Sequence, residues 1–287
     1  MNCGRLLRKF DAGLSATSLL VAAQFLVAPI TQAQTFLPMG PSPSSGVSET
    51  VQSRDAPPNG TVSGAAQSII VSPVAPNTLF LGTVNGGVWS SNDGGLQWTP
   101  LTDKQRSLSI SSLAFDPTDA TARTLIAGIG ITSNTYKGGL LTGLLYSTNA
   151  GVNWQEVTVS GAEDKNIVGV AARGDVILAA SADPHRPGIS GGLYRSVNRG
   201  ATFSRLDLGA PDAAASVTAL AGDPTNQTLL YAAQFSSSSA RNAVYASRDG
   251  GLTWGAEPVL TLEVGQRARL ATGPNGAVLV AAIRAMP

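Results

Sequence analysis

The sequence predicts an all-β protein, a β-propeller built from four-stranded blades. Three observations predict it: a short motif that occurs four times, a near-constant spacing between its copies, and alternating apolar stretches between them. The motif reads Ser-x-(Asp/Asn)-x-Gly-x-x-(Trp/Phe), and the steps between its Asp or Asn positions are 56, 49 and 51 residues. A period of about fifty residues that holds short strands is typical of a propeller blade. The four copies are Ser91, Asp93, Gly95 and Trp98; Ser147, Asn149, Gly151 and Trp154; Ser196, Asn198, Gly200 and Phe203; and Ser247, Asp249, Gly251 and Trp254.

Residues 1–33 have the features of a signal peptide. Arg5, Arg8 and Lys9 form a basic head, an apolar stretch runs over 14–30, and small residues precede a cleavage point after Ala33. A retained anchor helix is the alternative. The polar residues within the stretch and Pro29 at its end favour cleavage.

Residues 34–64 are rich in Pro, Ser and Gly, which predicts a mostly irregular leader. Part of 47–53 could still pair as an edge strand. Without residues 1–33 the chain keeps 16 of its 19 basic and 17 of its 18 acidic residues, so its net charge is −1. This balance excludes the basic surface that nucleic-acid binding requires. Cys3 is the only cysteine, so the exported chain would have no disulfide.

From residue 65 onward the chain divides into four blades and part of a fifth. The predicted limits are 65–108, 109–163, 164–212, 213–262 and a partial unit at 263–287. Each blade begins with an alternating apolar strand, at 68–71, 112–115, 167–170 and 217–220. A second strand follows at 78–82, 124–128, 176–180 and 229–233, and a third at 87–90, 144–147, 192–195 and 243–246. The motif comes next, and we expect a fourth strand to start at its aromatic residue.

The partial unit predicts only two strands, at 269–272 and 277–281. Propellers close with about four to eight blades. Either the leader completes the fifth blade or the chain belongs to a longer propeller, and we favour the second reading. Open blade edges would then promote association.

The motif itself predicts a tight turn between the third and fourth strands. Its glycine permits a positive φ, its Asp or Asn side chain can accept backbone N–H bonds, and its serine hydroxyl can join the same network. The aromatic ring would pack between sheets. Asn at two of the four positions suits a turn-building role better than a catalytic carboxylate.

These motifs make residues 65–287 resemble the Asp-box (BNR-repeat) propellers, a superfamily that includes sialidases, xyloglucan-cleaving glycosidases, the sortilin-type receptor domain and a photosystem assembly factor. The segment 82–103 is most similar to secreted bacterial members of unassigned activity. The resemblance implies a propeller fold and a structural role for the boxes, away from the ligand site. Because the motif is found in enzymes, receptors and assembly factors alike, it does not select a function.

The connectivity predicts where ligands would bind. Boxes and first-to-second turns should lie on one face of the propeller, and second-to-third loops and inter-blade links on the other. The longer loops of that second face supply the candidate binding residues. These are Tyr136, Lys137, Asp183, His185, Arg186 and Arg241. The alternative is that these loops are tolerated insertions.

No catalytic set can be assigned from the sequence. His185 is the only histidine, so a histidine-based zinc site lacks ligands, and no G-x-S-x-G context accompanies a serine nucleophile. A glycosidase needs two carboxylates. Candidates are Asp55, Asp103, Glu163, Asp164, Asp183 and Asp212, which the sequence does not pair. The Phe/Tyr-Arg-Ile-Pro motif of sialidases is absent from the sequence.

The sequence therefore predicts an exported scaffold that binds a glycan or a protein, with no cofactor, no metal and no stable membrane insertion after signal cleavage. The alternative is a propeller-type glycoside hydrolase of the sialidase or xyloglucanase kind. A third possibility is an assembly factor of the cell envelope.

Overall fold

The computed structural model describes residues 65–131, 138–182, 191–209, 215–223, 226–236, 242–273 and 277–284. The predicted signal peptide and leader lie outside these residues. The described chain forms strands joined by turns and loops, which agrees with its high content of apolar β-formers and its abundant glycine.

The strands make four antiparallel sheets of four strands each and one sheet of two. The first two sheets contain β1 (Ala65–Ser72), β2 (Ala75–Val84), β3 (Gly87–Ser91) and β4 (Thr99–Pro100); and β5 (Ile110–Phe115), β6 (Leu125–Ile129), β7 (Leu144–Ser147) and β8 (Gln155–Val157). The next two contain β9 (Asn166–Arg173), β10 (Val176–Ala182), β11 (Gly192–Ser196) and β12 (Ser204–Leu206); and β13 (Ser216–Gly222), β14 (Leu230–Phe235), β15 (Ala243–Ser247) and β16 (Leu260–Thr261). The last sheet pairs β17 (Gln266–Thr272) with β18 (Val278–Arg284).

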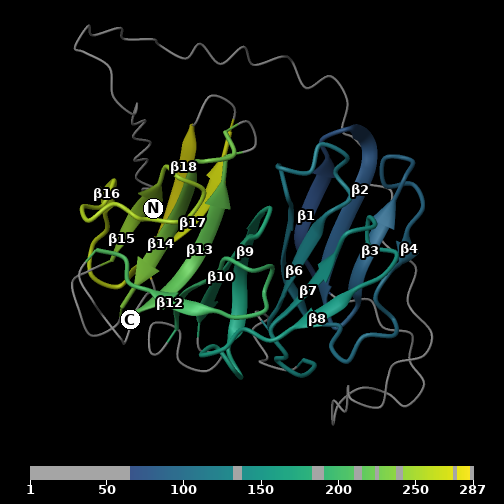
Figure 1. The fold of residues 1–287 in the computed structure, drawn as a ribbon, viewed down its shortest axis with the longest axis horizontal. Coiled ribbons are helices and arrows are strands. Elements are labelled where there is room, and N and C mark those ends of the chain that lie inside the picture. The colour runs from purple at the N-terminus through teal and green to yellow at the C-terminus, as the bar shows by residue number, and fades with distance from the viewer. Residues whose placement is uncertain are drawn as a thin grey trace, which may run out of the picture.

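Each sheet follows the chain order, so consecutive strands are neighbours. The first strands β1, β5, β9, β13 and β17 contact one another in sequence and form the inner side of the arrangement. Figure 1 shows the sheets succeeding one another from β1–β4 at the right to β13–β18 at the left. The predicted fold class, an all-β propeller of four-stranded blades with a partial fifth, is confirmed.

The apolar core lies between the sheets. Four clusters of buried side chains fill the spaces between successive sheets, and each draws residues from two of them. Between the first and second sheets, for example, Phe80 packs with Ile110 and Leu145. Every interior sheet therefore has an apolar face on each side, which explains why its middle strands are apolar at nearly every position.

A β-bulge recurs in the first strand of every complete sheet. It places one extra residue opposite the second strand, namely Gln67, Ser111, Val168 and Thr218. The Ser111 hydroxyl donates to the carbonyl of Gly128 in its own sheet and to that of Ile167 in the next. Bulges change strand direction locally, so these four re-aim the start of each inner strand in the same way.

The fourth strands start later than expected. In the first three sheets they begin one residue after the box aromatic, and β16 begins only at Leu260, six residues after Trp254. Pro258 has no N–H to donate to β15, and the pairing resumes where Val259 donates to the carbonyl of Val244 at 2.8 Å.

Candidate functional site

The four boxes and the first-to-second turns leave from the same end of the sheets, which we call the box end. In each complete blade, the N–H of the residue that precedes the box glycine donates to a carbonyl at the start of the second strand or in the turn just before it. The pairs are Gly94 with Asn77, Ala150 with Arg123, Arg199 with Asp175 and Gly250 with Thr228, at 2.7–2.9 Å. The second-to-third loops and the links between sheets leave from the opposite end, the loop end, because neighbouring strands are antiparallel.

The four boxes share one hydrogen-bond network. In the fourth box, the Ser247 hydroxyl donates to Asp249 Oδ1 at 2.8 Å and accepts from the N–H of Gly251 at 2.9 Å, and the N–H of Thr253 donates to Asp249 at 2.9 Å. The other three boxes make the equivalent three bonds at 2.8–3.0 Å. Each box glycine has a positive φ, as in Gly251 at 92°.

The networks also act on the box carboxylates. Burial raises the pKa of Asp249, but hydrogen bonds from Thr253 and Ser247 outweigh it and bring the pKa to about 2. A backbone N–H bond from Gln97 and a hydroxyl bond from Ser91 lower the pKa of Asp93. The box aromatics Trp154, Phe203 and Trp254 lie partly buried against three of the core clusters.

At the loop end, the loop after β6 is fixed at both of its ends. The buried Asn166 of β9 accepts the N–H of Ile131 at 2.6 Å and donates to the Ile131 carbonyl at 3.3 Å. On the other side, the buried Ser109 hydroxyl accepts the N–H of Gly139 at 2.8 Å and donates to Asn85 Oδ1 at 2.8 Å. A residue of β9 and one of the link before β5, itself bonded to the turn between β2 and β3, thus position this loop.

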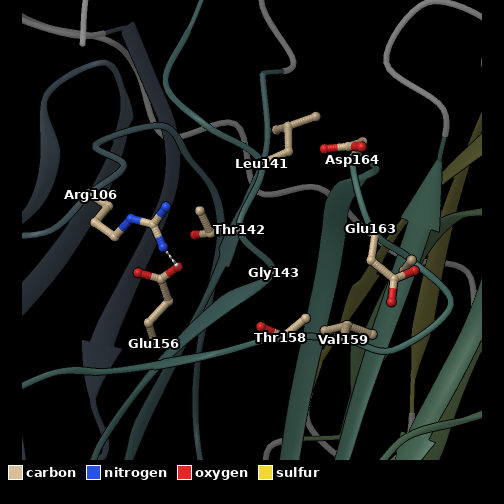
Figure 2. A pocket seen from close by; sticks show the side chains of 10 residues that line it. Arg106, Leu141, Thr142, Gly143, Glu156, Thr158, Val159, Glu163 and Asp164 are labelled. Atoms are coloured by element: carbon tan, nitrogen blue, oxygen red, sulfur yellow. Dashed lines mark ion pairs between the residues drawn. The ribbon is translucent and has the colours of Figure 1, made fainter.

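A pocket of about 240 Å³ opens beside the base of that loop, and we call it the loop-end pocket. It collects the end of the loop, strand β8, the link between β8 and β9, and one arginine from the link before β5. Figure 2 shows its lining side chains. They are Arg106, Leu141, Thr142, Gly143, Glu156, Thr158, Val159, Ala162, Glu163 and Asp164.

Charged groups lie on two opposite sides of the loop-end pocket. Arg106 Nη1 lies 3.6 Å from Glu156 Oε1 on one side, and Glu163 and Asp164 lie on the other (Figure 2). The pocket's described lining residues include three carboxylates and one guanidinium. Among the described residues, no ion pair joins Glu163 or Asp164 to a cation.

The link between β8 and β9 is a rigid wall of this pocket. Two consecutive turns close through the N–H of Ala162 to Val159 and the N–H of Lys165 to Ala162, and the Tyr194 hydroxyl donates to the Gly161 carbonyl at 2.6 Å. The Glu163 carboxylate accepts the Gly161 N–H at 2.9 and 3.0 Å. Backbone N–H bonds from Glu163 itself and from Gly161 lower the pKa of Glu163, so this carboxylate is a poor proton donor.

The floor of the loop-end pocket is apolar and contains one hydroxyl without a partner. Val159 and Ala162 are 1% and 2% exposed. Thr142 Oγ1 is buried and makes no hydrogen bond in the described part of the chain. The buried hydroxyls of Ser112 and Ser181 also lack a partner there, but of these three only Thr142 lines the loop-end pocket, where a ligand or a water would bond it.

A larger pocket of about 700 Å³ lies along the inner strands of all five sheets and reaches the box end. Three blades are tied together there. Asp116 Oδ2 accepts the N–H of Gly174 at 2.8 Å, Arg173 Nε donates to the Gln227 carbonyl at 2.7 Å, and Gln227 Nε2 donates to the Pro117 carbonyl at 2.7 Å. Burial lowers the pKa of Arg173, while the charges of Asp116 and Asp223 oppose that effect.

The candidate binding residues predicted from the longer loops lie outside the described residues. They are Tyr136, Lys137, Asp183, His185, Arg186 and Arg241. Of the candidate carboxylates, Glu163 and Asp164 line the loop-end pocket together, Asp103 does not, and Asp55, Asp183 and Asp212 are outside the described chain. Asp116 accepts bonds within its own turn from Thr118.

Sequence reasoning did not select Arg106, Thr142 or Glu156. Arg106 lies in a link between blades, and Glu156 lies on the partly exposed strand β8. Charged residues are common at both kinds of position, so neither residue stands out in the sequence. The one available signal was topological, because links and second-to-third loops share one end of the sheets.

Among the residues that the structure describes, no group of three or more His, Cys, Asp or Glu side chains is arranged to hold a metal ion. No helix long and apolar enough to cross a membrane occurs in that part of the chain.

No protein-family model and no curated protein matches the sequence. Solved structures do match. The GH74 xyloglucanase from Xanthomonas campestris aligns with a TM-score of 0.50 at 21% identity, over 67% of this chain and 29% of that one. An ancestral GH74 enzyme aligns with a TM-score of 0.52 at 23% identity, over 77% of this chain and 29% of that one. YCF48 bound to D1 peptide aligns with a TM-score of 0.46 at 16% identity, over 75% of this chain and 59% of that one.

At these identities the likeness shows the fold alone. The chain spans less than a third of the length of the two GH74 enzymes. The sheets and these alignments together define the chain as a β-propeller scaffold.

Proposed function

We propose that this chain is a binding scaffold and that its ligand, a glycan or a protein, occupies the loop-end pocket. One observation carries the proposal: charged groups, an apolar floor and an unpartnered hydroxyl meet in a concave site whose walls are fixed by Asn166, Ser109 and Tyr194. Rigid walls with a few placed polar groups are typical of binding sites.

The boxes support the finer assignment to the Asp-box propellers. Ser247, Asp249 and Gly251 make the bonds that such a turn requires, and the equivalent residues of the other three blades repeat them. Because the box side chains use these bonds within their own turns, we expect other residues to bind the ligand.

The test is a binding screen with defined oligosaccharides and defined peptides, using the full chain and two pocket variants. Thr142→Val removes the unpartnered hydroxyl at nearly constant volume, and Glu156→Gln removes the charge opposite Arg106. We expect a ligand that binds the unmodified chain to bind both variants several-fold more weakly. Unchanged binding by both variants would place the ligand elsewhere and contradict the proposal.

A glycoside hydrolase is the second candidate, because Glu156 faces Glu163 and Asp164 across the loop-end pocket (Figure 2). Such an enzyme needs one carboxylic acid that stays protonated to donate to the leaving group, and a raised pKa is its usual mark. The lowered pKa of Glu163 makes it unsuited to that role. Hydrolysis of xyloglucan or a sialoside by the chain, abolished by Glu156→Gln, would favour the enzyme over the scaffold.

We also propose that the protein is exported, on the strength of the basic head and apolar stretch in residues 1–33. Expression of the full chain in a bacterial host and N-terminal sequencing of the product test this. A product that begins at Gln34 is the expected outcome, and one that retains the first residues contradicts it.

A further inference from the structure

The charge of the loop-end pocket points to the class of its ligand. The three carboxylates and one guanidinium among the pocket's described lining residues give a formal charge of −2. Arg106 is already engaged with Glu156, at 3.6 Å. The side of the pocket formed by Glu163 and Asp164 thus presents two carboxylates that form no ion pair with the described residues, which favours a positively charged ligand group.

The distribution of apolar and polar groups in the pocket further restricts the chemical class of its ligand. The floor is made by the buried Val159 and Ala162 with the half-buried Leu141, while Glu163 and Asp164 are exposed at the rim. Lysine and arginine have this same division, with an apolar stem and a charged head. Among the described residues that line the pocket there is no aromatic side chain, so they offer a sugar ring no flat surface.

The unpartnered hydroxyl provides an independent observation. Thr142 Oγ1 lines the pocket, is buried, and has two lone pairs that no described donor uses. Lysine and arginine heads carry three and five N–H donors, and one of them would satisfy this oxygen once the Thr142 side chain turns toward the pocket.

We propose that the loop-end pocket binds the lysine or arginine side chain of a protein partner, with Glu163 and Asp164 holding its charge and Leu141, Val159 and Ala162 holding its stem. This inference rests on the proposed function, which assigns the same pocket as the binding site. It adds the chemical class of the ligand, a protein rather than a glycan.

The test uses the full chain and three capped pentapeptides that differ only in the central residue, which is lysine, norleucine or glutamate. Affinity is measured by calorimetry at about 0.01 M and about 0.5 M salt, where the screening length falls from about 30 Å to below 10 Å. We expect the lysine peptide to bind at least about tenfold more tightly than the norleucine peptide at low salt, and this preference to shrink at high salt.

Two charge-removing variants keep the local structure. Glu163→Gln retains an oxygen for the Gly161 N–H, and Asp164→Asn suits the left-handed backbone of residue 164, whose φ is 56°. We expect each to weaken lysine-peptide binding about fivefold, which is the upper range for an exposed charge pair. Asp175→Asn is the matched control, since Asp175 is an exposed, ion-paired carboxylate at the box end.

The outcomes separate the two proposals. Equal affinity for the lysine and norleucine peptides would contradict the proposal of a cationic ligand but leave the pocket as the binding site. The same conclusion would follow if a xyloglucan oligosaccharide bound the chain and Thr142→Val weakened that binding. No binding of any of these probes would overturn both. A lysine preference that survives in Glu163→Gln and Asp164→Asn would also overturn the inference.

Discussion

In the fourth box, the contribution of the hydrogen bonds to Asp249 can be measured separately from the contribution of its negative charge. Asp249 accepts bonds from the Ser247 hydroxyl, the Thr253 N–H and the Thr253 hydroxyl. Asn149 and Asn198 accept the equivalent serine and backbone bonds through an amide oxygen. Asp249→Asn should therefore keep the turn, whereas Asp249→Ala should remove it.

The magnitude follows from these bonds. Each net hydrogen bond contributes about 1 kcal/mol. Because the turn is partly exposed and water replaces some of the lost bonds, we expect Asp249→Ala to lower the free energy of unfolding by about 2 kcal/mol. For Asp249→Asn we expect about 1 kcal/mol or less. In a domain of this size the larger change corresponds to a fall in Tm of about 4–8 °C.

The charge effect depends on pH. The carboxyl has a pKa of about 2 in the folded chain against an ordinary value of 3.8, so folding favours its ionised form. That stabilisation is present above about pH 4 and is lost as the pH falls toward 2. The full difference would correspond to about 2.5 kcal/mol, and solvent screening at this partly exposed site reduces it to about 1 kcal/mol.

The assay is thermal unfolding followed by circular dichroism at neutral pH and at steps between about pH 4 and pH 2, with Asp175→Asn as the exposed-carboxylate control. The Asp249→Asn variant should lose less of its stability on acidification than the unmodified chain. If Asp249→Asn proves as destabilising as Asp249→Ala at neutral pH, the turn does not depend on the acceptor geometry and the reasoning is wrong.

Three further substitutions and one control test the packing of the blades by thermal unfolding. Gly128→Ala should lower the free energy of unfolding by about 1–3 kcal/mol, because a Cβ there would lie 2.6 Å from the Ile167 carbonyl oxygen of the next sheet. Gly273→Ala is the control and should leave the stability nearly unchanged, since the nearest atom to its Cβ would be 3.8 Å away. Arg173→Met should lower the free energy of unfolding by about 2–3 kcal/mol. It removes the positive charge near the buried Asp116 and Asp223 and the donor to the Gln227 carbonyl. An unchanged stability would show that these box-end contacts do not stabilise the fold. Tyr194→Phe should cost about 1 kcal/mol through the loss of its 2.6 Å bond to the link, and no change would mean that the hydroxyl bonds equally well to water.

The repeat made the sheets predictable. Every strand expected from apolar alternation lies within a strand of the structure or overlaps one, as at 112–115 within β5 and 144–147 for β7. The recurring bulge could not be foreseen, since its extra residues Gln67, Ser111, Val168 and Thr218 share no residue type. The position of the bulge depends on how neighbouring sheets pack, and the local sequence pattern does not indicate that packing.

The candidate site was only partly within reach of the sequence. Glu163 and Asp164 were among six candidate carboxylates, but their meeting with Arg106 and Glu156 joins residues up to 58 positions apart. Such pairings depend on which loop ends share a sheet end, and antiparallel order predicts the end without predicting the neighbours. The lowered pKa of Glu163 likewise depends on a turn that alternation does not reveal.

The placement of the core between sheets has a consequence for how the chain should come apart. Each complete interior sheet takes part in two clusters, whereas the β17–β18 pair takes part in one. Stability in such an array is a sum over neighbouring contacts, so opening should proceed inward from the outermost sheets. Amide hydrogens in β9 and β10 should then exchange last and those of β18 first. A damaged box in an interior blade would weaken both of its neighbours at once.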